Sequence, residues 1–369
     1  MSFLDPTLLA LGIALAAIKF YIIVELFLPV CLLIALSIIF SKIKKITARH
    51  ITITGQGVFI TGCDTGIGHH FALRLCQRGF TVFAGCLYPE ADGAEQLIRK
   101  GGDNIHIVPL DVTKQDSVDK ARDYVVQNCQ EKGMWAIVNN AGIESLSDIE
   151  MAPIECFKSN AEVNLYGMVR VTKAFLPTIR TYKGRIINVT SVKGRIAIPG
   201  NATYVMTKYG GEAFSDCLRR EVKRFGVKVI IIEPGNFAIT ALFSGKNLER
   251  FQSELNHAWE VASDGSRTTY GRKYLDHVLH SVDADARVKY AYPNLNPVMD
   301  AMDDSVTNEN PQHRYLIDGC SGLLDKYCVF ARLNPYLPER FMDYLIEKYF
   351  PPTPIAAETQ VTDNQEKSK

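Results

Sequence analysis

The sequence lacks a surplus of charge of either sign. Lys and Arg together number 41 and Asp and Glu 40, so the net charge is +1 at pH 7. Proteins that hold nucleic acid through its phosphates carry more basic than acidic residues, and we therefore expect no nucleic-acid partner. The sequence also lacks an internal repeat. The roughly 300 residues after its N-terminal apolar segment are enough for one large α/β domain, which is what we expect.

Closely spaced cysteines are absent as well. The nine cysteines are scattered and include no CxxC pair, whereas structural zinc sites and disulfide frameworks need short, regular spacings. We therefore expect no metal site. The cysteines are predicted to be free thiols, most of them buried, in a reducing compartment.

A long apolar run occupies the N-terminal part of the chain. From residue 7 to residue 41 only Lys19 and Glu25 are charged, and basic residues follow at Lys42, Lys44, Lys45 and Arg49. One helical span needs about 20 apolar residues, so we predict a transmembrane anchor that crosses the bilayer once, near 20–40, or twice as a hairpin. The run lacks the basic start and the cleavage site of a signal peptide. The basic flank predicts that the rest of the chain faces the cytosol.

Beyond residue 50, short apolar runs alternate with polar stretches of helical periodicity. The runs predict strands at 58–61, 80–86, 105–110, 134–139, 184–190 and 226–232. Strands that are apolar on both faces are typical of a parallel sheet covered by helices on both sides. We therefore expect an α/β fold with a Rossmann-type doubly wound sheet, whose chemistry lies beyond the carboxyl ends of the strands.

A glycine-rich segment follows the first predicted strand. Gly62, Gly66 and Gly68 lie in GCDTGIG and open into a helical pattern. Such glycines let backbone N–H groups and the positive end of a helix approach a pyrophosphate. A lone glycine cluster is often only a tight turn, but its place after the first strand favours a dinucleotide site.

A set of three residues later in the chain predicts proton transfer at a C–O group. Tyr204 and Lys208 are one helical turn apart, so the ammonium is expected to lower the pKa of the phenol from its usual value of about 10. Ser191 precedes Tyr204 by thirteen residues, and its hydroxyl can hydrogen-bond a substrate oxygen. A bound dinucleotide would supply the matching hydride carrier.

The same Tyr–Lys spacing occurs once more near the C-terminus. Tyr344 and Lys348 are also four residues apart, but the residue thirteen before Tyr344 is Ala331. We expect this second pair to lie on a solvent-exposed face of a helix.

Together these motifs resemble the short-chain dehydrogenase/reductase superfamily over roughly 57–320. The matching stretches are, in order, TGCDTGIG, LDVT, NNAG, VNLYG, the Ser–Tyr–Lys set and EPG. Within the superfamily the chain is similar to the branch that includes retinol dehydrogenases, 17-beta-hydroxysteroid dehydrogenase type 2 and mitochondrial D-beta-hydroxybutyrate dehydrogenase. The stretches VFAGCL, EKGMW, EAFSDCLRR and EPGNF resemble the last of these most.

The resemblance implies catalytic roles for four residues. Tyr204 would be the general acid and base, and Ser191 would orient the substrate oxygen. Lys208 would hold the nicotinamide ribose, and Asn164 would complete a water-mediated proton relay through Lys208.

The resemblance also implies a set of cofactor contacts. Asp111 would accept a hydrogen bond from the adenine amine, Pro234 and Gly235 would form the turn beneath the nicotinamide, and Thr240 would meet its carboxamide. Asn139, with its neighbours, would either line the cofactor or brace the sheet. The full set is Gly62, Asp64, Gly66, Ile67, Gly68, Asp111, Val112, Asn139, Ala141, Gly142, Tyr204, Lys208, Pro234, Gly235 and Thr240.

The end of the second strand favours NAD over NADP. An acid there binds the ribose 2′-hydroxyl of NAD, and basic residues there pair with the 2′-phosphate of NADP. This position is Cys86, and neither the glycine loop nor the following LYPEAD contains Arg or Lys. A 2′-phosphate would find no cationic partner, so we expect NAD.

The C-terminal third is expected to select the substrate. Phe251, Leu255 and Trp259 form an apolar stripe that indicates either core packing or a substrate-lining wall. The run 331–350 is amphipathic and would either close over the domain, meet another subunit or enter a membrane interface. We divide the chain into an anchor with its basic flank (1–50), a catalytic domain (51–320), an amphipathic extension (321–352) and a disordered tail (353–369).

Two substrate classes and one non-enzymatic role remain open. A lipophilic alcohol, steroid or retinoid, is favoured because an anchor would hold the enzyme where such substrates concentrate. D-3-hydroxybutyrate is the alternative, and its carboxylate would need a cation such as Lys193 or Arg195. A membrane scaffold or NAD sensor is disfavoured because the four catalytic residues are intact. The resemblance implies dimers or tetramers, and we expect the endoplasmic reticulum membrane, or alternatively a mitochondrial membrane.

Overall fold

The computed structural model describes residues 48–129, 133–237, 246–281, 294–320 and 324–355, together with single residues between 7 and 36. It divides into two compact units, Met1–Ile51 with Asn308–Asn310, and Thr52–Thr307 with Pro311–Lys369. Among the described residues, no helix has both the length and the apolar character needed to span a membrane. The predicted anchor at 7–41 lies almost entirely outside the described residues, as does most of the predicted tail.

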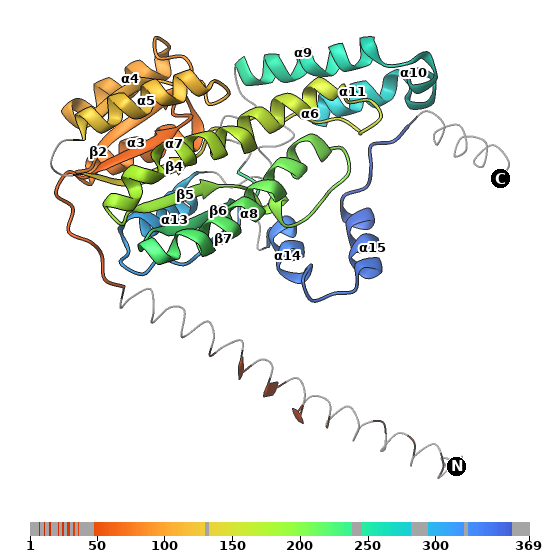
Figure 1. Cartoon of the computed structure of the whole chain (residues 1–369). Coiled ribbons are helices and arrows are strands. Elements are labelled where there is room, and N and C mark those ends of the chain that lie inside the picture. Colours follow the sequence, from red (N-terminus) through yellow and green to blue (C-terminus); the bar gives the residue numbers. More distant parts are fainter. Residues whose placement is uncertain are drawn as a thin grey trace. The chain divides into compact units, whose positions relative to one another are not determined.

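The larger unit is built on a sheet of seven parallel strands (Figure 1). Their order is β3-β2-β1-β4-β5-β6-β7, which reverses direction between β1 and β4 and so creates a switch point for a ligand. The strands are β1 (Gly57–Thr61), β2 (Thr81–Cys86), β3 (Ile105–Pro109), β4 (Met134–Asn139), β5 (Arg185–Val189), β6 (Lys228–Pro234) and β7 (Arg314–Ile317).

Six of these strands agree with the predicted ones to within two residues at each end, which confirms the Rossmann-type sheet. Strand β7 was not predicted. It has four residues, pairs only with β6 and is partly exposed along most of its length. An edge strand of this kind needs no long apolar run, so the sequence carried no clear signal for it.

Helices cover both faces of the sheet (Figure 1). On one face α3 (Gly66–Gln77) packs against α4 (Asp92–Gly101) and α13 (Asn296–Thr307). On the other face α5 (Gln115–Asn128), α7 (Gly167–Thr181) and α8 (Ala202–Val222) share one apolar core with strands β1 to β6. The rings of Phe59 and Phe175 stack in that core, with their centres 4.6 Å apart. This double layer fixes the positions of the loops at the carboxyl ends of the strands.

A π-helical turn interrupts the helical run before α7. Helix α6 (Ile154–Ala161) continues into the turn Glu162–Tyr166, and α7 follows without a break. Such one-turn bulges re-aim side chains and are common at functional sites. Here the turn carries Asn164, which is almost completely buried.

The C-terminal helices form two further clusters. Helices α9 (Lys246–Val261), α10 (Asp264–Tyr270) and α11 (Arg272–Ser281) pack around Phe251, Leu255 and Tyr274. Trp259 is partly buried against the same cluster. The predicted aromatic stripe is therefore core packing.

Helices α14 (Lys326–Leu333) and α15 (Glu339–Tyr349) make up the second cluster. Phe330 and Met342 pack with Val192 and Ile196, which follow β5. The apolar face of the amphipathic run therefore closes over the domain, as one of the alternatives predicted. The opposite face leaves Tyr344 exposed, as expected for the second Tyr–Lys pair.

Candidate active site

A cleft of about 1240 Å³ follows the carboxyl ends of the strands. Its walls contain residues from the segments after all seven strands. The register explains the convergence, because Thr61 lies opposite Gly85 and Asn139 opposite Asn188, so the strands end along one edge. The volume exceeds the roughly 300–1,000 Å³ of an ordinary small-molecule pocket, which leaves room for a dinucleotide and a substrate.

The glycine loop forms one end of the cleft and fits a dinucleotide. Gly62 and Gly66 have φ angles of +70° and +66°, a conformation that favours glycine. A Cβ on Gly68 would lie 2.4 Å from the carbonyl oxygen of Gly62, so only glycine lets α3 begin this close to the loop. Asn140 braces the loop by donating to the carbonyls of Thr61 and Gly62, at 2.9 and 3.0 Å. The N-terminus of α3 thus faces the cleft, as a pyrophosphate requires.

Carboxylates gather where the adenosine half of a cofactor would lie. Asp64 accepts hydrogen bonds from the backbone N–H groups of Leu87 and Tyr88, at 3.0 and 2.8 Å, just after β2. Asp111 accepts two hydrogen bonds from Thr113, at 2.9 and 2.7 Å. Both acids line the cleft, and Val112 lies between Asp111 and Thr113 on the same wall. The sequence predicted both acids as cofactor residues but not the hydrogen bonds of Asp64 to the loop after β2.

The cationic side chains of the cleft lie elsewhere. Among the described residues that line it, Lys193, Lys208 and Lys326 are basic. Lys326 is exposed, and its ammonium lies 6.0 Å from the ring centres of Tyr349 and Phe350. In the described part of the chain, no basic side chain lines the cleft beside Asp64.

Ser191, Tyr204 and Lys208 come together on the cleft wall. All three are buried, with Tyr204 6% and Lys208 4% exposed. Lys208 Nζ donates to the carbonyl of Val189 at 3.1 Å and lies 5.2 Å from the centre of the Tyr204 ring. The Ser191 side chain hydrogen-bonds with Tyr204, and its hydroxyl lies 3.4 Å from the carbonyl oxygen of Pro234.

The pKa values around this set differ from the expectation. Burial raises the pKa of the Tyr204 phenol above its ordinary value, the Glu144 carboxylate raises it further, and the hydrogen bond with Ser191 lowers it. Burial lowers the pKa of Lys208 to about 8, whereas Glu144 and Glu212 act to raise it. The predicted lowering of the phenol pKa is therefore wrong for the protein alone, because burial, the largest cause, raises the pKa.

Asn164 lies directly behind the cleft wall. Its Oδ1 accepts from the backbone N–H of Ile143 and its Nδ2 donates to the carbonyl of the same residue, both at 2.8 Å. The same Nδ2 donates to Thr207 Oγ1 at 3.0 Å. A Cβ on Gly142 would lie 3.4 Å from Asn164 Oδ1 and 3.7 Å from Lys208 Nζ, so both side chains approach the backbone of Gly142.

Asn139 lies inside the sheet rather than on the described cleft wall. Its Nδ2 donates to Thr172 Oγ1 at 3.0 Å and to Asn188 Oδ1 at 2.8 Å. These bonds tie β4 to β5 and α7. Of the two roles that the sequence left open, the structure thus places Asn139 as a brace, whereas Ala141 and Gly142 line the cleft.

The turn after β6 forms another part of the cleft wall. Pro234 and Gly235 line it, and a Cβ on Gly235 would lie 2.3 Å from Asp325 Oδ2. Asp325 is buried and accepts from the backbone N–H groups of Asn236 and Gly319, at 3.2 and 2.9 Å. It therefore holds together the turns after β6 and β7, a role that sequence reasoning missed. Thr240 lies outside the described residues.

Glu144 is a further site residue that sequence reasoning missed. Its Oε1 accepts from Lys193 Nζ at 2.6 Å and from Asn201 Nδ2 at 2.9 Å, and all three residues line the cleft. The sequence signal that could have pointed to Glu144 is an acidic residue two positions after the glycine of NNAG. The sequence suggested Lys193 as a cation for a substrate carboxylate, or as a solvated or loop-supporting residue.

A partly buried ionic network surrounds Glu212, which lies one helical turn after Lys208 in α8. Arg314 pairs with Glu212, with Glu233 at 3.1 Å and with Asp216 at 2.8 Å. Burial raises the pKa of Glu233 to about 7. Arg195, the other cation considered for a carboxylate, lies 3.7 Å from Glu233 and is absent from the described cleft wall.

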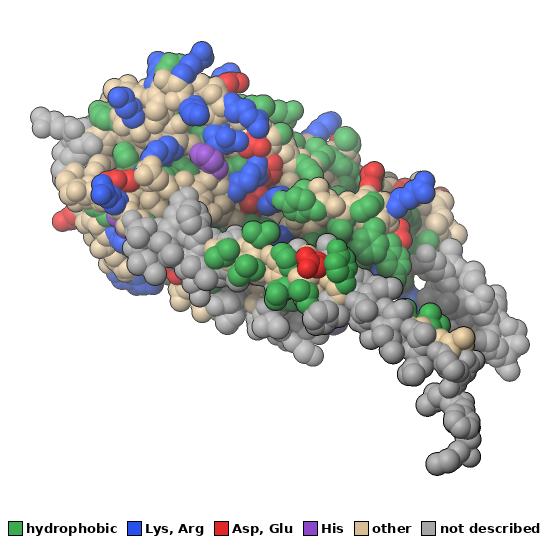
Figure 2. Space-filling view, turned by 90° about the horizontal axis from the view of Figure 1, so that it is seen from below, with side chains coloured by type: hydrophobic (Ala, Val, Ile, Leu, Met, Phe, Trp, Pro, Cys, Tyr) green, Lys and Arg blue, Asp and Glu red, His purple; other side chains and the backbone are tan. Residues whose placement is uncertain are grey.

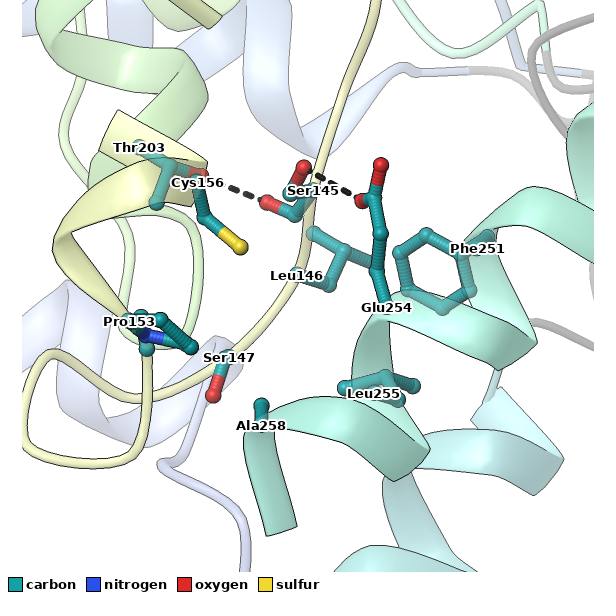
Figure 3. A pocket seen from close by; sticks show the side chains of 11 residues that line it. Ser145, Leu146, Ser147, Pro153, Cys156, Thr203, Phe251, Glu254, Leu255 and Ala258 are labelled. Carbon is teal, nitrogen blue, oxygen red and sulfur yellow. Dashed lines mark hydrogen bonds between the residues drawn. The ribbon is translucent and has the colours of Figure 1, made fainter. Parts of the chain in front are cut away.

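A second pocket lies beside the cleft, between the loop after β4 and α9 (Figure 3). Its volume is about 10 Å³, room for one water molecule at most. Phe251 and Leu255 line it, and Ser145 Oγ donates to Glu254 Oε2 at 2.8 Å across it. The pocket is therefore a packing defect behind the loop and not a ligand site.

Charged side chains of both signs are mixed on the protein surface. Figure 2 shows a face on which Lys and Arg lie among acidic, apolar and uncharged side chains. Several basic side chains are paired, such as Arg74 with Asp300 at 2.6 Å and Arg332 with Asp318 at 2.8 Å.

The site as a whole can exchange a proton with a substrate oxygen beside a dinucleotide cleft. Tyr204 presents a hydroxyl, Ser191 a second hydroxyl and Lys208 an ammonium, all on one wall. The glycine loop lines the same cleft. This arrangement suits transfer of a proton at a C–O group together with hydride transfer to a nicotinamide ring.

Comparison with known proteins gives a consistent result. The family of short chain dehydrogenases matches residues 56–250. The chain is 43% identical to mitochondrial D-beta-hydroxybutyrate dehydrogenase from Bos taurus over 265 residues, covering 70% of this chain and 76% of the relative. It is 40% identical to 17-beta-hydroxysteroid dehydrogenase type 6 from Bos taurus over 295 residues, covering 80% and 88%. It is also 40% identical to retinol dehydrogenase 7 from Rattus norvegicus over 263 residues, covering 70% and 79%.

A solved structure agrees in fold. A short chain dehydrogenase from Burkholderia cenocepacia, in complex with NADP, superposes with a TM-score of 0.57 at 20% identity. The match covers 80% of this chain and 99% of that one.

Proposed function

The chain belongs to the short chain dehydrogenase family and is an NAD(P)-dependent alcohol oxidoreductase, and within that class we propose that it is a membrane-anchored, NAD-dependent enzyme that interconverts a lipophilic alcohol and its ketone or aldehyde. The convergence of Ser191, Tyr204 and Lys208 on one wall of the cleft carries this proposal. A steroid or retinoid alcohol is the substrate class that we favour.

In the proposed reaction Tyr204 exchanges the proton. When alcohol is oxidised, the Tyr204 oxygen takes the hydroxyl proton while Ser191 hydrogen-bonds the same substrate oxygen. Bound NAD would supply the acceptor for the hydride that leaves the carbinol carbon, and the positive charge of oxidised NAD would favour the Tyr204 phenolate. Lys208 would hold the cofactor ribose, and Asn164 would complete a water-mediated proton relay through Lys208.

Acidic residues at the adenosine end support NAD as the cofactor. The Asp64 carboxylate, in the loop after β1, accepts from the backbone of the loop after β2, and no basic side chain accompanies it on the described wall. A 2′-phosphate there would meet a carboxylate of like charge.

Replacement of the acid tests this preference. Asp64→Asn should raise the ratio of kcat/KM with NADP to that with NAD by roughly tenfold, since one like-charge contact is removed. Asp103→Asn, at the amino end of β3, is the matched control. An unchanged ratio in Asp64→Asn would mean that another feature selects the cofactor.

The apolar run at 7–41 supports a membrane anchor, with the catalytic domain on the cytosolic side of the endoplasmic reticulum or, alternatively, at a mitochondrial membrane. An anchor concentrates the enzyme where lipophilic substrates partition. The family resemblance favours a dimer or tetramer packed through α8. Imaging of a tagged full-length protein, with protease access to its C-terminal tail, tests location and orientation together.

D-3-hydroxybutyrate is the second candidate substrate, favoured by the similarity to the Bos taurus hydroxybutyrate dehydrogenase. Against it, the two cations considered for its carboxylate are already paired: Lys193 with Glu144 and Arg195 with Glu233.

A substrate panel decides between the two candidates. Full-length protein reconstituted in liposomes is assayed with NAD against estradiol, retinol and D-3-hydroxybutyrate. We expect NADH formation with a lipophilic alcohol. Turnover of hydroxybutyrate alone would overturn the proposed substrate class while leaving the reaction class intact.

A further inference from the structure

An ion pair lies on the wall of the cleft next to Tyr204. The Lys193 ammonium donates to Glu144 Oε1 at 2.6 Å and lies 5.4 Å from the centre of the Tyr204 ring. The Lys193 side chain is 18% exposed and that of Glu144 only 4%. The pair is therefore largely removed from water, yet it belongs to the surface that a substrate meets beside the reacting oxygen.

Neighbouring contacts hold both partners in place. Ser145, the residue after Glu144, donates its hydroxyl to Glu254 at 2.8 Å, and its carbonyl accepts from Thr203 at 2.6 Å (Figure 3). The backbone N–H of Lys193 donates to Ser191 Oγ at 3.2 Å. These contacts fix the backbone at both positions, and Asn201 Nδ2 also donates to the Glu144 carboxylate at 2.9 Å, so the pair is a built part of the cleft wall.

The Lys193 cation beside the reacting position is already compensated. Glu144 pairs with Lys193 at 2.6 Å, Lys208 Nζ donates to the carbonyl of Val189, and Glu212 pairs with Arg314 away from the cleft wall. A substrate carboxylate that entered here would leave water without gaining an uncompensated cation, and it would lie close to the Glu144 carboxylate. A neutral alcohol incurs no such cost.

We propose that the Glu144–Lys193 pair sets the charge selectivity of the substrate site, admitting neutral alcohols and disfavouring those with a carboxylate within a few carbons of the reacting hydroxyl. This inference deepens, and rests on, the proposed function of the same site. Glu144 is the specificity-determining member, because it neutralises the cation that a carboxylate would otherwise bind.

Removal of the acid should release that cation. Glu144→Gln keeps a carbonyl oxygen that can accept from both Lys193 and Asn201 but loses the negative charge. The test measures kcat/KM with NAD for two matched pairs, D-3-hydroxybutyrate and its methyl ester, and (R)-3-hydroxydecanoate and its methyl ester. The ratio of acid to ester should rise roughly tenfold to hundredfold, the size of one charge-assisted hydrogen bond.

Lys193→Met supplies an independent test with the opposite sign. It leaves the Glu144 charge without its ammonium partner, so the acid-to-ester ratio should fall below that of the unmodified protein. In the double variant Glu144→Gln with Lys193→Met, the gain for the acid should disappear, which would show that the gain depends on Lys193.

Glu254→Gln is the matched control for a perturbed loop. It removes one negative charge behind the same loop, from a residue that lines the small pocket and not the cleft, and it keeps an acceptor for Ser145. Its acid-to-ester ratio should equal that of the unmodified protein.

The outcomes separate this inference from the proposed function. The inference alone is overturned if both Glu144→Gln and Lys193→Met still oxidise the esters but leave the acid-to-ester ratio of kcat/KM unchanged. It is also overturned if Glu254→Gln raises that ratio as much as Glu144→Gln does. Should Glu144→Gln fail to fold, as judged by circular dichroism, the sign of the Lys193→Met shift decides. Failure of the unmodified protein to oxidise any neutral alcohol, when it does oxidise the acids, overturns both.

Discussion

Helices α8 and α15 carry the same Tyr–Lys spacing in two different environments. Lys208 Nζ lies 5.2 Å from the ring centre of Tyr204, and Lys348 Nζ lies 5.8 Å from that of Tyr344. The local geometry is thus nearly the same. Yet Tyr204 is 6% exposed on the wall of a cleft, whereas Tyr344 is 55% exposed.

The difference teaches that spacing alone does not make a proton-transfer site. The residue thirteen before Tyr204 is a serine that follows β5 and hydrogen-bonds with the phenol, whereas the residue at that spacing from Tyr344 is Ala331, buried in α14. Only the first pair has a second hydroxyl and a cofactor cleft beside it. Four predictions test this contrast.

Loss of the phenol should have the largest effect. Tyr204→Phe should lower kcat by about 10²- to 10⁴-fold or more, because a positioned proton donor and acceptor is removed, while NAD binding, followed by fluorescence titration, stays near its original strength. Tyr344→Phe should leave kcat unchanged. Full activity in Tyr204→Phe would refute the proposed mechanism.

Loss of the lysine should come next. Lys208→Met should lower kcat/KM for NAD by roughly tenfold to hundredfold, as expected for the loss of a charged hydrogen-bond donor to the cofactor. Lys348→Met supplies the comparison and should change it less than twofold. Comparable losses in both variants would show that burial does not distinguish the pairs.

The burial of Lys208 should also affect how the free energy of unfolding depends on pH. Its pKa is lowered to about 8 in the folded chain, against about 10.4 when unfolded, so between these values the unfolded state binds more protons. Its contribution to stability therefore rises as pH increases from 8 to 10.5, by up to about 3 kcal/mol.

The measurement compares melting temperatures over that pH range. The melting temperature of Lys208→Met relative to that of the unmodified protein should fall as pH rises from 8 to 10.5. Lys348→Met provides the reference curve for removal of a lysine from the exposed pair. A constant difference across this range would contradict the lowered pKa.

The smallest effect is expected when the exposed Tyr344–Lys348 pair is given a serine at the matching spacing. Ala331→Ser, in the Tyr204→Phe background, places a serine thirteen residues before Tyr344. We expect no recovery of NADH formation in a coupled absorbance assay, since no cleft accompanies the serine. Measurable recovery would mean that the three-residue spacing suffices.

Features encoded by local pattern were predictable. The buried strands are continuous apolar runs, such as Ile186 and Ile187 in β5, so their positions agreed to within two residues. The glycine loop was predictable because Gly62 and Gly66 need positive φ angles at a strand-to-helix turn. Short, partly exposed β7 was not, because its pairing with β6 carries no pattern of its own.

Features that join distant segments were not predictable. Glu144 and Lys193 are 49 residues apart and each looks like an ordinary solvated charge until the fold buries them together. The lowering of the Tyr204 pKa was predicted wrongly for the same kind of reason, since burial depends on everything packed around the phenol.

The sequence by itself determined the family, the doubly wound sheet and the Ser191, Tyr204 and Lys208 set, because these rest on periodicity and short-range spacing. Only the tertiary structure decided how burial shifts the pKa of Tyr204, which carboxylate meets Lys193 and whether Asn139 braces the sheet. Those properties depend on desolvation and on contacts between segments far apart in the chain, and neither is written in local spacing.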